Sequence, residues 1–508
     1  MTCAVPLDTN RFRLTLWIVK RCICAAATLL TLAVSVQAQV ESLPAPVVNG
    51  NSFEILSNSR YSIHHEFTDT LSRQVLSNVL WAMNRVPHLG DYREFYVATP
   101  ENVYVYDSIA HALVVHRAGD FRYNPGAAFE VGIACERHEE AGFAVQAGLL
   151  AGTAFWNPDS ANVASCPMEI ARSWANSYWN PAESIKMVDV FGRATTTGLT
   201  TVIQARSSDS TLTTPRTDGA DTFEMLLAGG HQDSLFAPDA PSPESISQIL
   251  WAGYGVTPHR AYNGYRGTTI PTAAAQYYLT RLIYLVTDSA VFRYNNRLPP
   301  GTGLTTSDHR IEVIVSGDRR PQLRAACTRI PSTAPVYIVV CVLDTSRYRD
   351  LQEAGFAGFQ YLMQAASLGL QGFLTTPLAV AERHDIIVAL GIPNDQPALV
   401  FAFGSPQPVP LDEAGIRTDR SIAIRVVGNR PPVRIDYSLG SVGSGKFVIY
   451  DLAGRPVRTF ELAPQTPGPH GLDWNGAGES GPPVPSGVYI CRLEAGGAAS
   501  STHVVISR

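Results

Sequence analysis

An internal repeat constrains this chain more than any other feature of its sequence. Residues 53–84 align with residues 223–254 without a gap, at a constant offset of 170 positions (223 − 53). Both segments open with Phe-Glu-x-Leu, and both later carry Leu-Trp-Ala within an apolar stripe of helical spacing. Each copy therefore predicts a short helix, a loop and a second helix, so the chain is predicted to contain one fold twice.

The repeat continues beyond these helices with a changed offset. Residues 95–106 match residues 283–294, now 188 positions apart (284 − 96), so the second copy holds about eighteen extra residues between helix and strand. The matched segments alternate like β-hairpins, with turns at 99–102 and 287–290. A buried strand, a helix with the letters EAGFA and a closing strand follow in both copies. Each copy reads helix, helix, hairpin, strand, helix, strand, which is an α+β unit.

The EAGFA helix is best preserved in the second copy, within residues 351–377. Its apolar side chains recur at the i, i+3, i+4, i+7 spacing of a buried stripe. Gly369 and Gly372 follow, where a glycine can take a positive φ and let another group approach the backbone. We predict a central helix here, with a strand starting near Phe373.

The first 38 residues have the order of a secretory signal peptide. Basic residues precede an apolar run from Cys22 to Val36, and Gln37-Ala38 follows as a cleavage site. The run is too short to span a membrane comfortably, so export is favoured over a membrane anchor, and no later run is long and apolar enough to cross a bilayer. Five cysteines remain in the mature chain, and their wide spacing allows one or two disulfides or free buried thiols.

Composition and spacing argue against two classes of function. The chain has 508 residues, is 45% hydrophobic and carries a formal net charge of −5 without a basic stripe, so nucleic-acid binding is unsupported. Residues 64–66 (His-His-Glu) and 138–140 (His-Glu-Glu) lack a third ligand at useful spacing, and we predict solvated surface groups there, not a metal site. The aromatic cluster of Trp174, Tyr178 and Trp179 is more typical of a core than of a ligand platform.

The pattern of residue types in the sequence changes at about residue 421. From there, short strand-like segments alternate with turn residues, as in an all-β sandwich. The predicted organisation is a signal peptide (1–38), a first α+β unit (51–197), a polar linker (198–221), a second α+β unit (222–408) and a β-sandwich (421–508).

The second copy resembles the nitroreductase family, most closely its azoline-dehydrogenase-like branch. The resemblance rests on SISQILWAGYGV, TTIPTAAAQYY, EAGFAGFQYLMQAASLGLQG and LGIPNDQPALVFAFG, which occur in this order between residues 222 and 406. The first copy is more weakly similar over residues 52–193, through RYSIHHEF, LSNVLWAMN, YVATPENVYVYD and EAGF. Known members of the family are homodimers with FMN in the subunit interface. The resemblance therefore implies that the two copies form an intramolecular pseudo-dimer.

The last 75 or so residues resemble the Ig-like domain of flagellar hook-capping proteins and of type IX secretion tails. The matching motifs are VIYDLAGRPVRTFEL, LDWNG, PSGVYICRLEAG and STHVVISR. This resemblance implies a secreted or cell-surface product of a Gram-negative bacterium, with the type IX secretion machinery as a partner.

The nitroreductase resemblance also implies where FMN would bind. The family's Arg-x-Ser-x-Arg-like phosphate element corresponds to a segment that keeps Arg60 and Ser62 but ends in His64. In the second copy the same positions are residues 230–234. They place no lysine or arginine in the motif, and they add the carboxylate of Asp233. A carboxylate beside a phosphate dianion would be repulsive, so the second copy is not expected to hold a phosphate.

The family's second element, Pro-Ser-Ala, comes from the partner subunit and survives only in the second copy, at residues 271–273. It would face Arg60 and Ser62 of the first copy, so at most one composite FMN site is predicted. Arg266 is either a cation for substrate or phosphate or a solvated loop residue. The predicted cofactor-binding residues are Arg60, Ser62, His64, Arg266, Pro271, Thr272, Ala273, Gly369 and Gly372. No catalytic residue is identified.

Two functions from different classes follow from these observations. A chain with FMN would transfer hydride to or from the flavin, with a small molecule or peptide as substrate. Export argues against an NAD(P)H reductase, because nicotinamide cofactors are not held outside the cytoplasm, and favours an oxidase or dehydrogenase role. The alternative is a flavin-free pseudoenzyme that serves as a secreted or cell-surface scaffold.

Overall fold

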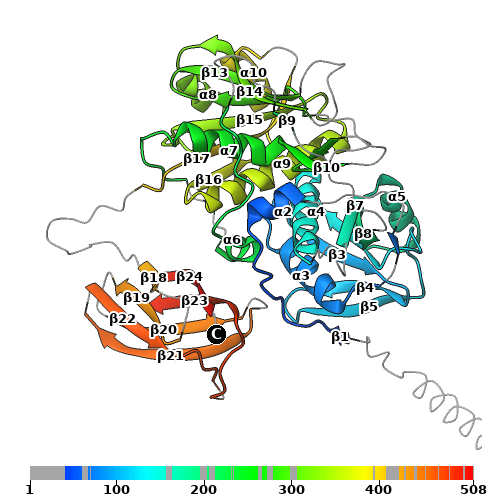
Figure 1. Ribbon diagram of the computed structural model, residues 1–508, viewed down its shortest axis with the longest axis vertical. Helices are drawn as coiled ribbons and strands as arrows, with labels where there is room; N and C mark the ends of the chain where they lie inside the picture. Colours follow the sequence, from blue (N-terminus) through cyan, green and yellow to red (C-terminus); the bar gives the residue numbers. More distant parts are fainter. Residues whose placement is uncertain are drawn as a thin grey trace, which may run out of the picture.

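The computed structural model shows three bodies that follow one another along the chain (Figure 1). The predicted signal peptide lies outside the described residues. No helix in the described part of the chain is both long and apolar enough to cross a membrane. The structure describes residues 40–59, 67–68, 70–155, 163–194, 203–204, 212–229, 232, 234–260, 266–271, 279–297, 306–392, 395–407, 423–427, 431–439, 443–451, 454–466, 468–479, 481–495 and 498–506.

The first unit is built on one sheet with the strand order β1-β5-β4-β3-β6-β8-β2, in which β7 also pairs with β8. All of these pairings are antiparallel. Its helices are α2 (Phe53–Ser59), α3 (Arg73–Asn84), α4 (His138–Thr153) and α5 (Glu169–Tyr178). Its strands are β1 (Val40–Ser42), β2 (Phe67–Thr68), β3 (Arg93–Ala98), β4 (Asn102–Asp107), β5 (Ala112–Ala118), β6 (Phe129–Cys135), β7 (Val163–Pro167) and β8 (Ile185–Ala194).

The second unit repeats this topology, which confirms the predicted duplication. Its order β14-β13-β12-β15-β17-β16 corresponds strand for strand to β5-β4-β3-β6-β8-β7. The predicted turns are also present, because the Thr99 and Thr287 amides donate to the Asn102 and Ala290 carbonyls at 2.9 and 3.1 Å.

The elements of the second unit include several that the repeat did not predict, among them α8 and α10. Its helices are α6 (Phe223–Gly229), α7 (Pro243–Tyr254), α8 (Arg320–Ala326), α9 (Tyr348–Ser367) and α10 (Val380–Leu390). Its strands are β9 (Ile203–Gln204), β10 (Val256–Arg260), β11 (Arg266–Thr268), β12 (Ile283–Val286), β13 (Ala290–Arg297), β14 (Thr306–Ser316), β15 (Val336–Val342), β16 (Gln371–Thr375) and β17 (Gln396–Gly404).

The two units share one hydrophobic core, formed where helices of both units pack against each other between the two sheets (Figure 1). This core includes Val79 and Phe143 of the first unit with Phe359 and Ile338 of the second, all of them buried. The outer face of each sheet is covered separately, by α5 in the first unit and by α8 and α10 in the second. The chain therefore forms an intramolecular pseudo-dimer of two α+β units with the same topology.

The glycine of the EAGFA motif explains why the central helices α4 and α9 can cross closely. A Cβ on Gly142 would lie 2.4 Å from the carbonyl oxygen of Gln352, and a Cβ on Gly355 would lie 2.3 Å from that of Glu139. Both separations are shorter than real Cβ contacts, so only glycine fits on either side. The two clashes are related by the repeat, which places the pseudo-twofold axis at this crossing.

Each unit is preceded by an extended segment, which we call a strap: residues 43–51 for the first unit and 212–221 for the second. The Asn78 side chain accepts from the Val47 amide at 3.1 Å and donates to the Val47 carbonyl at 2.7 Å. Gln248, its counterpart in the repeat, does the same with Arg216, at 2.8 and 3.0 Å. Both straps are therefore held by the same two backbone contacts.

A second pair of anchors holds the straps through a buried serine and histidine. In the first unit, Ser77 Oγ donates to the Pro44 carbonyl at 2.6 Å and lies 2.8 Å from His111 Nε2. In the second, Ser247 Oγ donates to the Thr213 carbonyl at 3.0 Å and lies 3.0 Å from His309 Nε2. A tyrosine hydroxyl, Tyr106 or Tyr294, lies at 2.8 or 2.9 Å from Nδ1 of each histidine. Because each serine proton goes to a backbone carbonyl, these are structural anchors and not activated nucleophiles.

One sequence prediction about charged residues is wrong. The segment 138–140 was expected to be solvated surface, yet Glu139 and Glu140 are 3% and 0% exposed. They lie in the first turn of α4, which α9 crosses and covers. Glu140 accepts from Arg93 at 3.1 Å and from the Leu89 amide at 2.9 Å, so its charge is matched inside the protein. No group of ligands suited to a metal ion occurs among the described residues.

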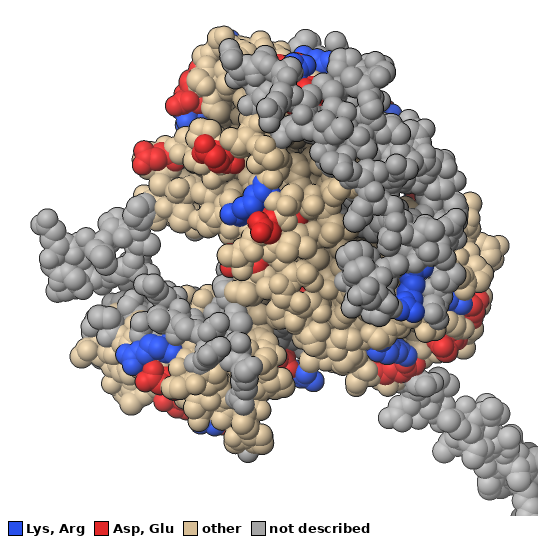
Figure 2. All heavy atoms as spheres, viewed as in Figure 1, with Lys and Arg blue, Asp and Glu red and all other residues tan. Residues whose placement is uncertain are grey.

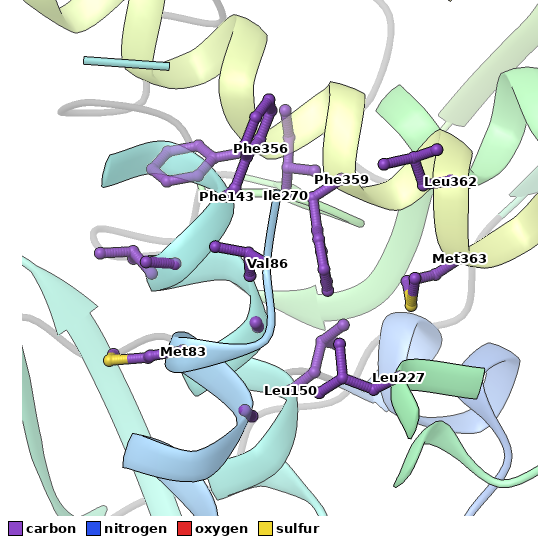
Figure 3. Close-up of a cluster of buried hydrophobic side chains, with 14 of the residues drawn as sticks. Met83, Val86, Phe143, Leu150, Leu227, Ile270, Phe356, Phe359, Leu362 and Met363 are labelled. Carbon is purple, nitrogen blue, oxygen red and sulfur yellow. The ribbon is translucent and has the colours of Figure 1, made fainter. Parts of the chain in front are cut away.

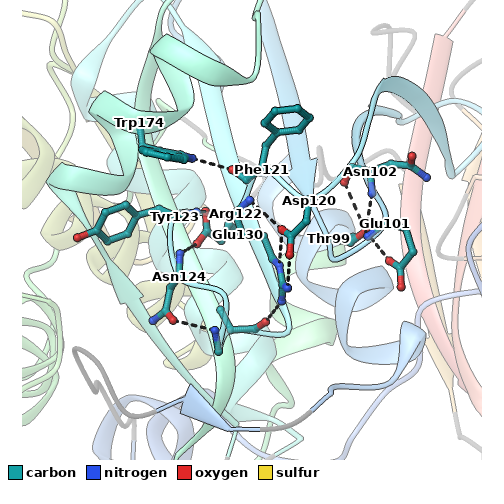
Figure 4. Close-up of polar contacts among 12 residues, drawn as sticks. Thr99, Glu101, Asn102, Asp120, Phe121, Arg122, Tyr123, Asn124, Glu130 and Trp174 are labelled. Carbon is teal, nitrogen blue, oxygen red and sulfur yellow. Dashed lines mark hydrogen bonds and ion pairs between the residues drawn. The ribbon is translucent and has the colours of Figure 1, made fainter.

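The aromatic cluster of the first unit divides between core and surface. Trp179 is fully buried, whereas Tyr178 is 44% exposed. The indoles of Trp174 and Trp179 both donate to the Phe121 carbonyl at 2.8 Å, and Figure 4 shows the Trp174 bond beside the Arg122–Asp120 ion pair.

The neighbouring Glu130 ties the same loop to the sheet (Figure 4). Its carboxylate accepts from the Tyr123 and Asn124 amides at 3.0 and 2.7 Å. Burial nevertheless raises the pKa of Glu130 to about 7. Among the cysteines, Cys135, Cys166, Cys327, Cys341 and Cys491 are all free and buried, which settles the choice left open by their spacing.

The C-terminal body is an antiparallel β-sandwich, as predicted. Its two sheets have the orders β18-β19-β22 and β21-β20-β23-β24. Their inward side chains, among them Ile435, Phe447 and Trp474, form a separate core. The strands are β18 (Ala423–Val427), β19 (Val433–Leu439), β20 (Gly443–Tyr450), β21 (Pro456–Gln465), β22 (Gly468–Trp474), β23 (Gly487–Ala495) and β24 (Ala498–Ile506).

Candidate functional site

The pseudo-twofold axis relates two positions at the boundary between the units. Ser52 and Thr222, which occupy equivalent places before α2 and α6, form an antiparallel bridge with each other. The helices α2 and α6 then run away from this bridge. We call the surroundings of the end of α2 the first face and the surroundings of the end of α6 the second face. Any site built on the pseudo-dimer could occur at either face.

At the first face, the second unit inserts its extra segment against the first unit. The carbonyl of Thr269 accepts from Gln146 of α4 at 3.2 Å and from Gln360 of α9 at 2.9 Å. Ser57, near the end of α2, in turn donates to the side-chain oxygen (Oε1) of Gln360 at 3.3 Å. A short hydrogen-bonded chain thus joins α2 of the first unit to the inserted loop of the second.

The inserted loop is held rigidly by its own unit. Thr269 and Gly255 exchange two hydrogen bonds, from the Thr269 amide to the Gly255 carbonyl at 3.0 Å and from the Gly255 amide to the Thr269 hydroxyl at 3.2 Å. Thr269 and Ile270 are fully buried, and Pro271 is buried as well. Figure 3 shows Ile270 close to Phe143 of α4 and to Phe356 and Phe359 of α9. Residues 269–271 of this loop therefore pack against both central helices.

Residues on both sides of these contacts lie close in sequence to the predicted composite site. Ser57 lies three residues before Arg60, and Thr269 lies two residues before Pro271. Arg60, Ser62, His64, Thr272 and Ala273 lie outside the described residues. Arg266 begins β11, where its backbone pairs with that of Arg260, so it lies in a strand; its side chain is not among those described.

The two predicted glycines have structural roles near the other face. Gly369 has a φ of +68° and ends α9 with its amide bonded to the Ala366 carbonyl at 2.9 Å. A Cβ on Gly372 would lie 2.6 Å from the ring of Phe401, so internal packing alone requires a glycine there. Gly372 also lines a cavity at the second face. A cofactor role for either glycine stays a prediction.

The second face contains a cavity of about 230 Å³ between the units. Its lining residues are Arg85, Pro87, Leu227, Gln232, Phe359, Leu362, Met363, Ala366, Leu370 and Gly372. The Arg85 guanidinium lies over the ring of Trp81, 4.8 Å from its centroid, and burial lowers the pKa of Arg85. Sequence reasoning missed Arg85 because nothing in its local pattern marks it; it meets α6 and α9 only in the folded chain.

This second cavity does not suit FMN. Pockets for drug-sized ligands typically measure about 300–1,000 Å³, and this cavity is smaller. Gln232 stands within the family's phosphate element, but it is neutral, and its side-chain oxygen already accepts from the Leu374 amide at 2.6 Å. Apart from Arg85 and Gln232, the described lining residues are apolar, so a phosphate dianion would lose its hydration and meet at most one cation. That this copy holds no phosphate stays a prediction.

On the face drawn in Figure 2, the described residues form no large patch of a single charge. There, the described Lys and Arg side chains lie next to Asp and Glu side chains, and wide uncharged areas separate them.

Comparison with known proteins finds one family model that matches the C-terminal body and several similar solved structures. Residues 425–498 match the family model of the FlgD Ig-like domain. No curated protein matches the chain. Among solved structures, the chain is similar to a protein assigned as a nitroreductase from Anabaena variabilis, with 11% identity and a TM-score of 0.47, over 67% of this chain and 90% of that one.

Two further solved structures are similar over shorter stretches. One is a protein assigned as a nitroreductase from Ralstonia eutropha, with 19% identity and a TM-score of 0.31, over 42% of this chain and 97% of that one. The other is an FMN-dependent nitroreductase from Clostridium difficile, with 12% identity and a TM-score of 0.25, over 37% of this chain and 88% of that one. Identities and scores this low do not transfer a reaction from those proteins to this chain.

Proposed function

We propose that this chain, with its two nitroreductase-like units and its FlgD Ig-like domain, is an exported FMN-dependent oxidoreductase with one composite flavin site at the first face. The supporting observation is the hydrogen-bonded chain from Ser57 through Gln360 to Thr269. It fixes the segment before Arg60 and the segment before Pro271 on opposite sides of a single glutamine. The described residues just before these two elements thus come from different units and contact the same glutamine.

Each predicted residue would contribute a definite interaction. Arg60 would pair with the phosphate, with Arg266 as a further cation for phosphate or substrate, and Ser62 and His64 would donate hydrogen bonds. Pro271, Thr272 and Ala273 are small enough to let the backbone approach a flat ring. Bound FMN would supply hydride transfer at its N5 atom, and the protein would hold a small-molecule or peptide substrate in reach. Because export separates the chain from nicotinamide cofactors, oxidation of the substrate is favoured over reduction by NAD(P)H.

The second candidate function is a flavin-free scaffold at the cell surface, delivered by type IX secretion. It is favoured by the second face, where the repeat has Gly230 in place of Arg60 and Gln232 in place of Ser62, and where the Gln232 side chain accepts a hydrogen bond from the protein itself. If the first face has drifted in the same way, the units would serve only as a rigid body beside the sandwich.

The two candidates are distinguished by the absorbance of the mature chain, residues 39–508, before and after incubation with FMN. The oxidoreductase proposal expects flavin bands that remain after gel filtration, at a ratio of one FMN per chain. A colourless protein that takes up no FMN would rule this proposal out and leave the scaffold.

A pair of variants tests the position of the site. Arg60→Ala is expected to weaken FMN binding at least about tenfold, because it removes a charge-assisted phosphate contact. Gln232→Ala, at the second face, serves as the matched control and should leave FMN affinity unchanged. Unchanged affinity in Arg60→Ala would refute the composite geometry. Mass spectrometry of exported protein tests the predicted cleavage after Ala38.

A further inference from the structure

We propose that the C-terminal sandwich is a detachable cap on the second face: docked on α6, it keeps the cavity closed, and undocked, it opens the cavity to apolar molecules. Because the cap belongs to the same chain, access to the cavity depends on the conformation of the chain itself. The proposal does not depend on whether FMN binds at the first face.

Val488 connects the sandwich to the two units. Along β23 the side chains alternate between two faces, and Tyr489, Cys491 and Leu493 belong to the core of the sandwich. Val488 belongs to the opposite face, on which Arg492 is exposed. Val488 is nevertheless only 3% exposed, and it is part of the hydrophobic core that the two units share. Its burial therefore comes from docking and not from the fold of the sandwich.

The docking surface on the units is α6. Both β23 and β24 contact this helix, and Figure 1 shows the two strands beside it. The helix has seven residues, fewer than an isolated helix needs to be stable, so its position depends on what packs around it. Leu227 of α6 lines the cavity and points toward Met363 and Phe359 of α9 (Figure 3). The same short helix therefore contacts the sandwich and forms part of the cavity wall.

The sandwich also lies close to the strap of the first unit. Asp451 and Arg455 form an ion pair across the turn between β20 and β21, with 2.8 Å between their side chains. Burial lowers the pKa of His111, and the charges of Arg455 and Asp451 act on this pKa in opposite directions, so the turn lies near His111. His111 contacts the first strap, with its Nε2 atom 3.0 Å from the Pro44 carbonyl oxygen. The docked sandwich is therefore next to both units.

The docking contact is of a kind that can be reversed. The sandwich has a hydrophobic core of its own, and among the described buried residues it contributes Val488 alone to the shared core. Small interfaces between domains permit relative motion, whereas large apolar ones prevent it. When the sandwich leaves, α6 loses the packing on its outer side. The wall that carries Leu227 is then free to move away from α9, which opens the cavity.

The experiment removes the docking contact in the mature full-length chain with Val488→Asp. This change should favour the undocked state by about tenfold or more, because it replaces a buried valine with a charge. Small-angle X-ray scattering should show a larger radius of gyration, and the apolar dye anilinonaphthalene sulfonate should show several-fold higher fluorescence. Ser501→Asp is the matched control. Ser501 pairs with Arg492 on the same face of the sheet and is exposed, so neither signal should change.

A second substitution separates undocking from opening of the cavity. Ala366→Phe fills the cavity, and because Ala366 is only half-buried, the larger ring can be accommodated. Combined with Val488→Asp, it should keep the larger radius of gyration and remove the gain in dye fluorescence.

Three results would overturn the proposal. An unchanged radius of gyration in Val488→Asp would show that Val488 does not hold the sandwich. Unchanged fluorescence would show that the cavity stays closed without the cap, and a gain that persists in the double variant would place the dye elsewhere. If Val488→Asp fails to fold, Val488→Thr keeps the β-branched shape and should give the same two changes to a smaller extent. The absence of both changes in Val488→Thr would then overturn the proposal as well.

Discussion

The two units agree where they hold the fold together and differ where they border the two faces. The glycine crossing of α4 and α9, the strap contacts of Asn78 and Gln248, and the buried histidine anchors all occur twice. The inserted loop around Thr269 occurs once in the sequence, and the described cavity beside Arg85 lies at the second face. Symmetric features therefore report on stability, and the asymmetric ones are where function should be sought. Three predictions test whether the symmetric pairs are equivalent in energy.

The largest effect is expected at the helix crossing. Gly142→Ala and Gly355→Ala each place a Cβ against a backbone carbonyl that cannot move alone, and each should lower the free energy of unfolding by about 3 kcal/mol or more. Denaturant unfolding followed by circular dichroism measures this loss. Gly148→Ala, in the same helix, is the control, because its Cβ would meet the flexible end of Met83, which can shift. Wild-type stability in either crossing variant would contradict the close approach.

A smaller and pH-dependent effect is expected at the histidine anchors. Burial lowers the pKa of His309 to about 4, so on acidification the unfolded chain takes up a proton near pH 6.5 while the folded chain resists until about pH 4. The free energy of unfolding should therefore fall between pH 6.5 and pH 4, by up to about 3 kcal/mol from this residue.

The matching variants show whether the two anchors behave alike. His309→Gln should flatten the fall in stability below pH 6.5, when unfolding is measured at a series of pH values. Burial lowers the pKa of His111 as well, so His111→Gln should change the profile in the same direction. A pH profile identical to wild type in His309→Gln would show that this histidine is not buried in its neutral form.

The smallest effect is expected at the strap amides. Asn78→Ala and Gln248→Ala each remove two hydrogen bonds to a strap backbone, and each should cost about 1–2 kcal/mol in the free energy of unfolding. Because the two anchors belong to different units, the double variant should show the sum of the single losses. A large loss in one variant and none in the other would mean that only one strap is needed for stability.

Much of the fold could be predicted because the sequence pattern of each repeated helix and strand occurs twice, once in each copy. Alternating apolar residues specified the hairpins, and the spacing around Phe356 and Phe359 specified the central helix. The helices α5, α8 and α10 were not predicted, because they cover the outer faces differently in the two units and so have no matching partner in the alignment. The burial of Glu139 and Glu140 was missed since it depends on the crossing of α9, which no local pattern encodes.

Less of the candidate sites could be predicted, for a related reason. The resemblance indicated that residues near Arg60 and Pro271 belong together, and the contacts of Ser57 and Thr269 agree with that proximity. It could not indicate the cavity, whose walls are brought together from positions as distant as Arg85 and Met363. Such a site exists only after the two units have packed.

The covalent joining of the two units has a genetic consequence. In a homodimer every substitution appears at both copies of an interface, so a change that improves one position is imposed on its mate. Here Thr269 and its loop occur in one half only, and Gly230 can take the place of a cation in one half without any change to Arg60 in the other. A single chain can thus keep one face under selection for one ligand while the opposite face is free to acquire another.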